Sequence, residues 1–587
     1  MRLKMIQEAS RWRRLRWAWG LGIAVCTLAA GARIRPASVN SYEGQARRGG
    51  SSLFLSWLPW HKPVLDKQGK LLAWYEPGKN LGYDKVLRLV WNFIEYKVPN
   101  EDKTGLKVYL VNSCFNGNPV PNNEWQHHRS MLRAPYLQGN QWQHNPAMLF
   151  AAFVDSLLGW YPYSGDEKAV NVVGQMLDYQ LAHGTTPADW NWASVPFATS
   201  CGNDRNYGRC LQFSGVPWSF YGGIMPDKVG ELGAAYVLYY EMTGEKKYLD
   251  AALKCAQALA KHIRPGDADH TPWPLRVDGR TGKVIYDEEY GGMEVAPVRL
   301  FDELIRLHAG DVASFQRARN IAWKWILRYP MRDDKWGGYF EDVGYGPAHE
   351  NQTVPTMTAR YILNRDNPAT VDPNWRNDVR HIINWTREKF GVGPYFGAWG
   401  INEQTGCCSP VGLGSDTSRW GAINAMYYEK TGDVQARKDA FRSLNYATYF
   451  AASDGKASCC GNLFGGNQYW FSDGYADYSR HFSWAMCAIP AFAPKGENHL
   501  LCSSSVVQKV SYKERNVSYR TFDQTASEVL RLHFRPARVT SGGKPLPKRK
   551  VLERGATGYS VLPLGSGDYV VRVQHTNSRE VNVEGKQ

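Results

Sequence analysis

The chain has 587 residues, of which 43% are hydrophobic and 13% aromatic, so it can bury a large core and is too long for one ordinary domain. Its formal charge of +15 is concentrated at the two ends: residues 1–32 carry six Lys/Arg and one acid, and residues 500–587 carry fifteen and seven. The body between them is nearly neutral, with forty-nine basic and forty-seven acidic residues, which argues against nucleic-acid binding.

The first 32 residues have the layout of a secretory signal peptide. A basic stretch at residues 11–16 precedes an apolar run at residues 17–30, and Ala30-Gly31-Ala32 has the form of a cleavage site. We expect cleavage after Ala32 and export to the periplasm or the exterior. The alternative is an uncleaved anchor, although a bilayer span needs about twenty apolar residues; membrane contact is expected only through this segment. Residues 33–82 are interpreted as an N-terminal extension.

A short phrase recurs along the middle of the chain and predicts helical hairpins. It reads "SGDEKAVNVV" at Ser164, "TGEKKYLDAA" at Thr243, "AGDVASFQRA" at Ala309 and "TGDVQARKDA" at Thr431. In each phrase the Gly suits the left-handed end of one helix, and the acid beside it can cap the next. The gap before the last phrase is close to twice a repeat, and residues 365–373 supply the missing tip.

A first helix at residues 83–97 and a last at 475–491 bring the pattern to about twelve helices. We therefore expect a mainly α protein, with an (α/α)6 toroid of six hairpins at residues 83–495 that closes by pairing its first and last helices. After Pro494 the sequence alternates apolar and polar positions between Gly/Pro turns, which predicts a small β-sandwich at residues 503–587. This module would either bind carbohydrate or pack on the barrel and complete it.

The connections between hairpins are long, rich in Trp, Tyr, acids and Gly, and should all lie at one end of the ring. Aromatic faces can stack on sugars and carboxylates can bind hydroxyl groups, so this end is the predicted cleft. Packing between the loops is the alternative role for the aromatic residues. The predicted sugar-contacting residues are Trp190, Trp192, Trp273, Trp336, Trp399, His349 and Tyr478.

The hairpin repeats and loop phrases such as "WGGYF" resemble the six-hairpin (α/α)6 glycosidase-type superfamily over about residues 80–495. Members of that superfamily hydrolyse, epimerise or eliminate within carbohydrates, so the resemblance implies a carbohydrate substrate without choosing the reaction. We expect a glycoside hydrolase. The alternatives are a polysaccharide lyase or sugar epimerase, in which His349, His481 or Tyr478 would move the proton, and a non-catalytic glycan-binding surface protein.

Hydrolysis of a glycosidic bond needs one protonated acid and one carboxylate that attacks or activates water. The phrases "YDEEYGG" and "FSDGYADYSRHF" each place several acids directly before a helix that should line the ring. The predicted catalytic acids are therefore Asp287, Glu289, Asp473 and Asp477, and helix capping is the alternative role for each of them.

Eleven cysteines become ten once Cys26 leaves with the signal peptide, and an even number favours disulfides in an oxidising compartment. Cys201 and Cys210 are the easiest local pair. Cys255 and Cys487 lie in helical patterns, where they are equally consistent with small buried side chains.

Two vicinal cysteine pairs, in "GINEQTGCCSPVG" and "ASCCGNLFGG", flank one predicted hairpin and should return to the same end of the ring. Three roles are open: disulfides between the loops, unrelated buried thiols, or a zinc–thiolate site. The last arrangement resembles the zinc-dependent β-L-arabinofuranosidases. That resemblance implies zinc as cofactor, Glu403, Cys407, Cys459 and Cys460 as ligands, and Cys459 as nucleophile. The sequence indicates neither the sugar and linkage nor the oligomeric state.

Overall fold

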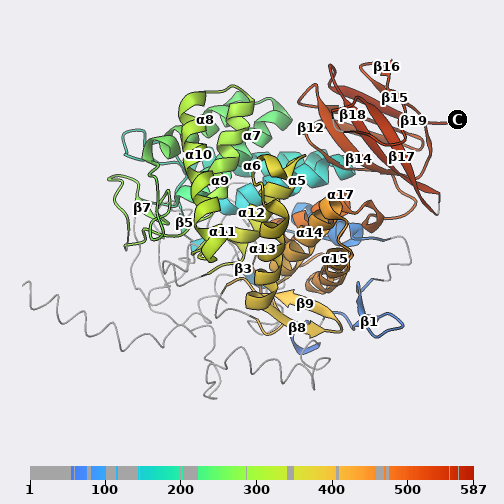
Figure 1. Cartoon of the computed structure of the whole chain (residues 1–587), viewed down its shortest axis with the longest axis horizontal. Helices are drawn as coiled ribbons and strands as arrows, with labels where there is room; N and C mark the ends of the chain where they lie inside the picture. Colours follow the sequence, from blue (N-terminus) through green and yellow to red (C-terminus); the bar gives the residue numbers. More distant parts are fainter. Residues whose placement is uncertain are drawn as a thin grey trace, which may run out of the picture.

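The computed structural model describes residues 55–58, 60–75, 81–98, 100, 107, 114–116, 143–144, 146–198, 200–201, 222–285, 287–339, 350–404, 409–457, 468–470, 475–553, 555–565 and 567–586. A helical body is followed by two antiparallel sheets at the C-terminus (Figure 1). Within these segments no helix combines the length and apolar character needed to cross a membrane.

In the part of the chain that the structure describes, six helices form the inner layer of the helical body. Their sequences are apolar or small nearly all round, because a helix covered on every side has no face left for water. Each contacts the next in chain order and the last contacts the first, so that the contacts close into a cycle. The inner helices are α5 (Pro146–Ser164), α7 (Pro226–Thr243), α9 (Val295–Arg306), α12 (Thr353–Leu363), α14 (Gly414–Thr431) and α17 (Ala476–Ala488).

Six amphipathic helices cover the inner layer within the described residues, and all but the first pack on the inner helix of their own hairpin. The first of them packs on α17, which pairs the first helix of the chain with the last, as the sequence predicts. It continues as a π-helix over Phe93–Lys97. The outer helices are α3 (Asp84–Asn92), α6 (Glu167–His183), α8 (Lys246–His262), α10 (Val312–Arg328), α13 (Trp375–Phe390) and α15 (Val434–Ala447).

The hairpin tips confirm the interpretation of the repeated phrase. Gly244 ends α7 with a φ of 80°, a conformation in which a side chain would be strained. Asp166, Asp311 and Asp433 each accept hydrogen bonds from backbone amides in the first turn of the following helix. Glu245 departs from the pattern, since its side chain forms no capping bond with the described start of α8.

The C-terminal sheets have strand orders β11-β14-β18-β17 and β12-β13-β19-β15-β16. Apolar residues of both, such as Leu530 and Val571 in one and Val517 and Val583 in the other, are fully buried in a common core. The strands are β11 (His499–Ser503), β12 (Val507–Lys513), β13 (Asn516–Thr521), β14 (Ala526–Leu532), β15 (Pro536–Ser541), β16 (Lys544–Pro545), β17 (Gly558–Gly565), β18 (Asp568–His575) and β19 (Glu580–Gly585).

The C-terminal sheets dock where the inner helices end, which we call the tip end of the helical body. Tyr512 of β12 donates its hydroxyl to the carbonyl oxygen of Pro162, near the end of α5. Gln508 donates to the carbonyl oxygen of Glu241, near the end of α7, at 2.7 Å. These contacts support the interpretation of the strand region as a module that packs on the helices.

The cysteines in the described residues have two different roles. A disulfide joins Cys487 of α17 to Cys502 of β11 and ties the helical body to the sheets. The interpretation of Cys487 as a small buried side chain is therefore wrong, whereas Cys255 is a buried free thiol. The side chain of Cys201 and the whole of Cys210 lie outside the described structure.

Short two-stranded sheets lie in the connections at the opposite end, where the inner helices begin. We call this the loop end, and the long inter-hairpin connections lead into it as predicted. The pairs are β1 (Val64–Leu65) with β2 (Leu71–Leu72), β3 (Cys114–Asn116) with β10 (Gln468–Trp470), β4 (Gln143–His144) with β5 (Ser200–Cys201), β6 (Gly223–Ile224) with β7 (Val277–Asp278), and β8 (Gly391–Tyr395) with β9 (Ala398–Ile401).

A buried ion pair lies inside the C-terminal sheets. His575 of β18 is fully buried, with Nε2 3.2 Å from Glu528 Oε1 and Nδ1 2.9 Å from the carbonyl oxygen of Ser578. Tyr519 donates its hydroxyl to the other oxygen of Glu528 at 3.0 Å. Burial lowers the pKa of His575, but the interactions with Glu528 and Ser578 outweigh it, so that this pKa is raised above its ordinary value.

We expect Glu528→Gln to lower the free energy of unfolding by about 3 kcal/mol at pH 6, because it removes one partner of a buried pair. Since the folded pKa of His575 is raised, the pair stabilises fully below the unfolded pKa of about 6.5 and less as pH rises through the folded pKa. The loss should therefore be smaller at pH 8. Urea unfolding at both pH values measures it, with the exposed Glu580→Gln as control; an equal loss at both would contradict the ion pair.

Candidate active site

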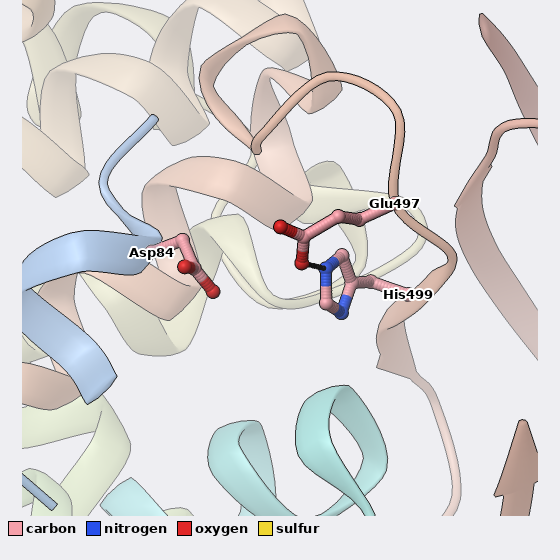
Figure 2. Close-up of side chains that lie close together, drawn as sticks. All are labelled: Asp84, Glu497 and His499. Atoms are coloured by element: carbon pink, nitrogen blue, oxygen red, sulfur yellow. Dashed lines mark hydrogen bonds and ion pairs between the residues drawn. The ribbon is translucent and has the colours of Figure 1, made fainter. Parts of the chain in front are cut away.

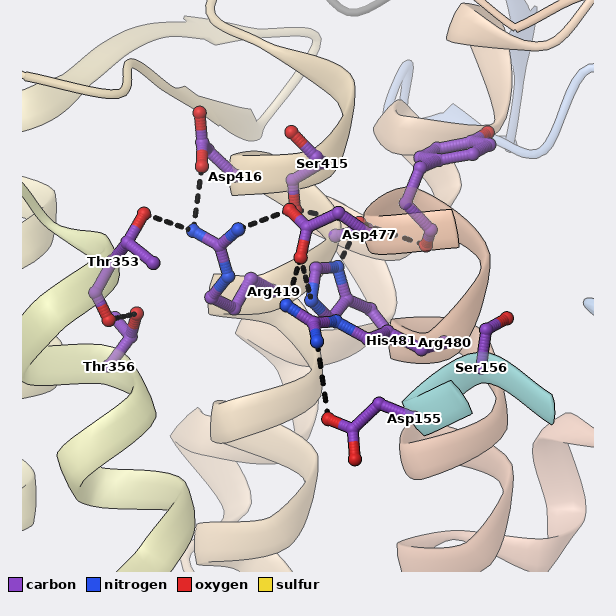
Figure 3. A network of polar contacts seen from close by, with 12 residues as sticks. Asp155, Ser156, Thr353, Thr356, Ser415, Asp416, Arg419, Asp477, Arg480 and His481 are labelled. Carbon is purple, nitrogen blue, oxygen red and sulfur yellow. Dashed lines mark hydrogen bonds and ion pairs between the residues drawn. The ribbon is translucent and has the colours of Figure 1, made fainter. Parts of the chain in front are cut away.

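A network of buried charges connects the inner helices, and Figure 3 shows the part of it that runs from Asp416 through Arg419, Asp477 and Arg480 to Asp155 of α5. The carboxylate oxygens of Asp155 lie 3.2 Å from Arg299 Nη2, 2.5 Å from Arg360 Nη1 and 3.1 Å from Arg480 Nη1. Burial alone would raise the pKa of Asp155, but the three guanidinium groups hold it well below its usual range. We call this group and its continuation described next the arginine network.

The arginine network continues toward the loop end. Arg480 also pairs with Asp477, and Asp477 pairs with Arg419. Arg419 in turn lies 2.7 Å from Asp416 and donates to Thr353 Oγ1 at 2.9 Å. Burial raises the pKa of Asp416 to about 6, with Arg419 opposing the shift and the nearby Asp477 adding to it. Cations and anions thus alternate through the buried interior.

His481 of α17 is fully buried against this network. Its Nδ1 lies 2.8 Å from Ser418 Oγ, and its Nε2 lies 3.8 Å from Asp477 Oδ1. Burial, together with Arg419 and Arg480, lowers the pKa of His481 well below its ordinary value. The imidazole is therefore neutral at physiological pH and adds no further positive charge.

A second group, the mouth cluster, consists of Asp227, Lys228, Glu231, Glu294 and Tyr339 and lies where α7 and α9 begin. Lys228 Nζ is 3.0 Å from Asp227 Oδ2 and 3.7 Å from Glu231 Oε2. The same ammonium group lies 3.0 Å from the centre of the Tyr339 ring. Tyr339 donates its hydroxyl to Glu231 at 3.3 Å. All five side chains are buried, so each charge depends on its neighbours for compensation.

Two carboxyl groups of the mouth cluster have raised pKa values. Burial raises the pKa of Glu231, with the positive charge of Lys228 opposing the shift. Burial, reinforced by the charge of Asp227, raises the pKa of Glu294 well above its usual range. Asp227 itself is paired with Lys228 and accepts a hydrogen bond from the backbone amide of Met293 at 3.0 Å. A protonated acid thus lies near a paired carboxylate, as general acid–base chemistry requires.

Glu294 borders a small cavity with room for about a single water molecule. Gly292, Trp336 and Thr358 lie among the residues that line it. Within the described residues, Glu294 Oε2 is buried without a hydrogen-bond partner. A neutral carboxyl with one open position can exchange its proton with a group that enters this cavity.

The predicted catalytic acids fall into three situations. Asp477 is buried inside the arginine network. Asp287 is exposed, and Glu289 is partly exposed and paired with Arg264, so neither belongs to the mouth cluster or to the arginine network. Water already solvates these two carboxylates, whereas the carboxyl groups with raised pKa values, Glu231 and Glu294, are buried. Asp473 lies outside the described residues.

Two predicted sugar-contacting tryptophans are core residues. Trp192 and Trp273 are each 1% exposed. Trp192 stacks on His262, and Trp273 donates its ring N–H to the carbonyl oxygen of Leu259 at 3.0 Å. Their faces are covered by protein, so their prediction as stacking platforms does not agree with the structure. Trp336 is also buried, but it lines the cavity beside Glu294.

The other predicted sugar-contacting residues differ from one another in their exposure to solvent. Trp190 and Trp399 are partly buried in loop-end connections and keep some exposed surface. Tyr478 is 1% exposed and donates its hydroxyl to the carbonyl oxygen of Ala447 at 2.7 Å, which is a packing role rather than contact with a sugar. His349 lies outside the described residues.

The proposed zinc ligands are covered by the structure only at Glu403. This residue is partly buried, and its carbonyl oxygen accepts a hydrogen bond from the backbone amide of Gln352 at 3.1 Å, beside the start of α12. Cys407, Cys459 and Cys460 lie outside the described residues. The zinc site and the nucleophilic role of Cys459 therefore stay predictions.

A different cluster has ligand types suitable for a metal. Asp84, Glu497 and His499 place one ligand atom each within 4.8 Å of one another, between α3 and β11 (Figure 2). Arg88 donates from Nε to Asp84 at 2.8 Å and from Nη2 to Glu497 at 3.1 Å, and His499 Nε2 lies 3.0 Å from Glu497. Because a guanidinium already neutralises both carboxylates, we assign this cluster to holding the sheets against the helices.

The acids predicted from the loops include no residue of the mouth cluster, and they do not include Asp155 of the arginine network. Asp227, Lys228 and Glu231 occur in "PDKVGELGAAYVLYY", the first part of an inner helix. A charge in a helix that is otherwise apolar on all sides must be buried, and a buried charge needs a partner. That signal was present in the sequence and points to the same residues.

No family model and no curated protein match the chain. Among similar solved structures is cellobiose 2-epimerase from Spirochaeta thermophila, with a TM-score of 0.49 and 9% identity over 71% of this chain and 98% of that one. A sugar epimerase from a ruminal bacterium has a TM-score of 0.45 and 9% identity, covering 69% and 97%. A family 76 glycoside hydrolase from a bovine Bacteroides thetaiotaomicron strain has 0.44 and 9%, covering 69% and 77%.

We expect Asp155→Asn to lower the free energy of unfolding by about 3–5 kcal/mol, because three guanidinium groups, of which that of Arg480 is buried, lose their common buried carboxylate. Urea unfolding followed by tryptophan fluorescence measures this loss, and the exposed Asp250→Asn on α8 is the matched control. The double variant Asp155→Asn/Arg360→Met should recover part of the loss, since it also removes one cation. A loss below about 1 kcal/mol would show that these charges are not coupled.

Proposed function

We propose that this protein is a carbohydrate-active enzyme built on an (α/α)6 toroid and that it hydrolyses glycosidic bonds at its loop end. The observation that carries the proposal is the buried Glu294, whose pKa is raised well above its usual range, close to the paired carboxylate of Asp227. A glycosidase needs one acid that stays protonated and one carboxylate that stays charged.

In this proposal Glu294 donates its proton to the leaving oxygen. Asp227 is the second carboxylate, held in place by its ion pair with Lys228 and by the hydrogen bond from the backbone amide of Met293. Glu231 and Tyr339 surround the Lys228 ammonium group from the other side, which restricts where it can point. The pair of carboxyl groups is thus held by residues of α7 and of the connection that leads into α9.

A carbohydrate is the proposed substrate because the loop-end connections combine Trp, Tyr, acids and amides. Trp190 and Trp399 keep part of their surface exposed there and are the proposed stacking residues. Export through residues 1–32 belongs to the same proposal, since it would bring the enzyme to polysaccharides outside the cell.

A second reaction, elimination or epimerisation, is favoured by one observation. His481 is neutral, and its buried Nε2 has no hydrogen-bond partner among the described residues. A neutral imidazole near a carboxylate can remove a proton from a sugar carbon. Products distinguish the reactions: hydrolysis creates reducing ends without an unsaturated sugar, and elimination creates the ultraviolet absorbance of a double bond.

We expect Glu294→Gln to lower kcat at least about hundredfold while KM changes little, because the amide keeps the shape of the site and cannot supply a proton. Release of reducing ends from a panel of plant and bacterial polysaccharides measures kcat. The partly exposed Glu289→Gln should retain activity. Retention of full activity by Glu294→Gln would assign the acid elsewhere.

The pH profile provides an independent test. Glu294 acts only while protonated, so the activity of the native enzyme should be present below its pKa and be lost as pH rises through it. That pKa is raised, so the alkaline limb should lie well above the ordinary Glu pKa of about 4.3. Residual activity of Glu294→Gln should lack this limb; an unchanged limb would contradict the assignment.

A further inference from the structure

The second feature of the molecule that suggests binding lies far from the mouth cluster, on the C-terminal sheets. Between residues 532 and 552 the chain has six Lys/Arg and no acid. Five of these side chains follow one another from β15 through β16 into the next connection, and all five are exposed. We call them the basic edge: Arg538, Lys544, Lys548, Arg549 and Lys550.

The basic edge differs from the other charged regions in lacking counter-charges. None of its five side chains forms an ion pair with an acid of the described chain. Arg549 donates from Nε to the neutral carbonyl oxygen of Thr557 at 3.0 Å, which fixes its guanidinium on the surface. Glu584 is opposite Arg538 in the sheet but accepts a hydrogen bond from Asn582. Neighbouring cations without partners repel one another, and a bound polyanion would relieve this repulsion.

The position of the basic edge leaves it accessible. In the five-stranded sheet, β12 contacts α5 and α7, and β16 is at the opposite margin. Four strand spacings of about 4.8 Å separate these margins, or about 19 Å. Figure 1 accordingly shows β15 and β16 on the side of the sheets away from the helices.

The same margin is unsuited to pairing with another strand. Pro545 lies within β16 and Pro547 follows it, and neither has a backbone N–H to donate. Recognition here must therefore use side chains. Lys544, Lys548 and Lys550 are spaced along an exposed segment, so their charges form a row rather than a pocket.

We propose that the basic edge binds an acidic polysaccharide whose carboxylate or sulfate groups repeat along the chain. This inference rests on the proposed function, from which it takes the class of polymer. Flexible lysines beside an arginine fork suit anions that repeat along an extended chain. The surface would hold such a polymer near the enzyme without taking part in the chemistry.

The test uses polygalacturonate as the polyanion and dextran as the neutral polymer. The mature chain should be retarded in affinity electrophoresis by polygalacturonate but not by dextran, and added salt should abolish the retardation. The triple variant Lys548→Gln/Arg549→Gln/Lys550→Gln should bind polygalacturonate about tenfold more weakly, the sum of several exposed ion pairs. The control Lys254→Gln/Lys324→Gln/Lys438→Gln removes the same charge from exposed sites on the outer helices and should bind like the native protein.

Equal weakening by both triple variants would show an effect of net charge alone and would overturn the proposal. So would binding to single-stranded DNA, or to vesicles of anionic phospholipid, as tight as binding to polygalacturonate. Glu294→Gln separates this proposal from the proposed function, because it should lose hydrolysis and keep polymer binding. If Glu294→Gln keeps full activity while only the basic-edge variant loses binding, the proposed acid is wrong and the basic edge stands.

Discussion

The structure depends on balancing charge where water does not reach. The inner helices bury one another on every side, yet several carry Asp, Glu, Lys or Arg into that interior. Some of these groups pair within their own helix, as Lys228 does with Asp227, and others pair between helices: Asp155 alone compensates three arginines from α9, α12 and α17. Where such a pair joins two inner helices, a shift of one helix along the other would break it, whereas an apolar face tolerates such shifts.

The same burial also creates a chemical difference between two carboxyl groups of the helical body. Asp155 has three guanidinium partners and stays ionised, while Glu294 borders a small cavity, is affected by the charge of Asp227 and stays protonated. The two carboxyl groups are equally buried, so it is their neighbours that decide their charge. Burial with full compensation near Asp155 stabilises the fold, and burial with partial compensation near Glu294 leaves the protonated acid on which the proposed function depends.

The hairpins could be predicted from the sequence because their tips have local causes. A Gly that permits positive φ and an Asp that caps the next helix act within a few residues, as at Gly244 and Asp166. The site could not be predicted in the same way, because partners such as Asp227 and Met293 are distant in sequence. Residue type alone also gave a wrong prediction. Tryptophans often stack on sugars, but Trp192 and Trp273 are covered by packing against His262 and Leu259. Of the features of the site, only the charged residues within otherwise apolar helices could be recognised from the sequence.

The docking of the C-terminal sheets at the tip end sets a length scale for anything that touches both ends of the molecule. Helix α7 has 18 residues and is therefore about 27 Å long, and it separates the mouth cluster at its start from β12 at its end. The disulfide between Cys487 and Cys502 keeps the sheets from moving away from this position. A ligand shorter than α7 could therefore touch only one end of the molecule, and only a longer one running along the outside could touch both at once.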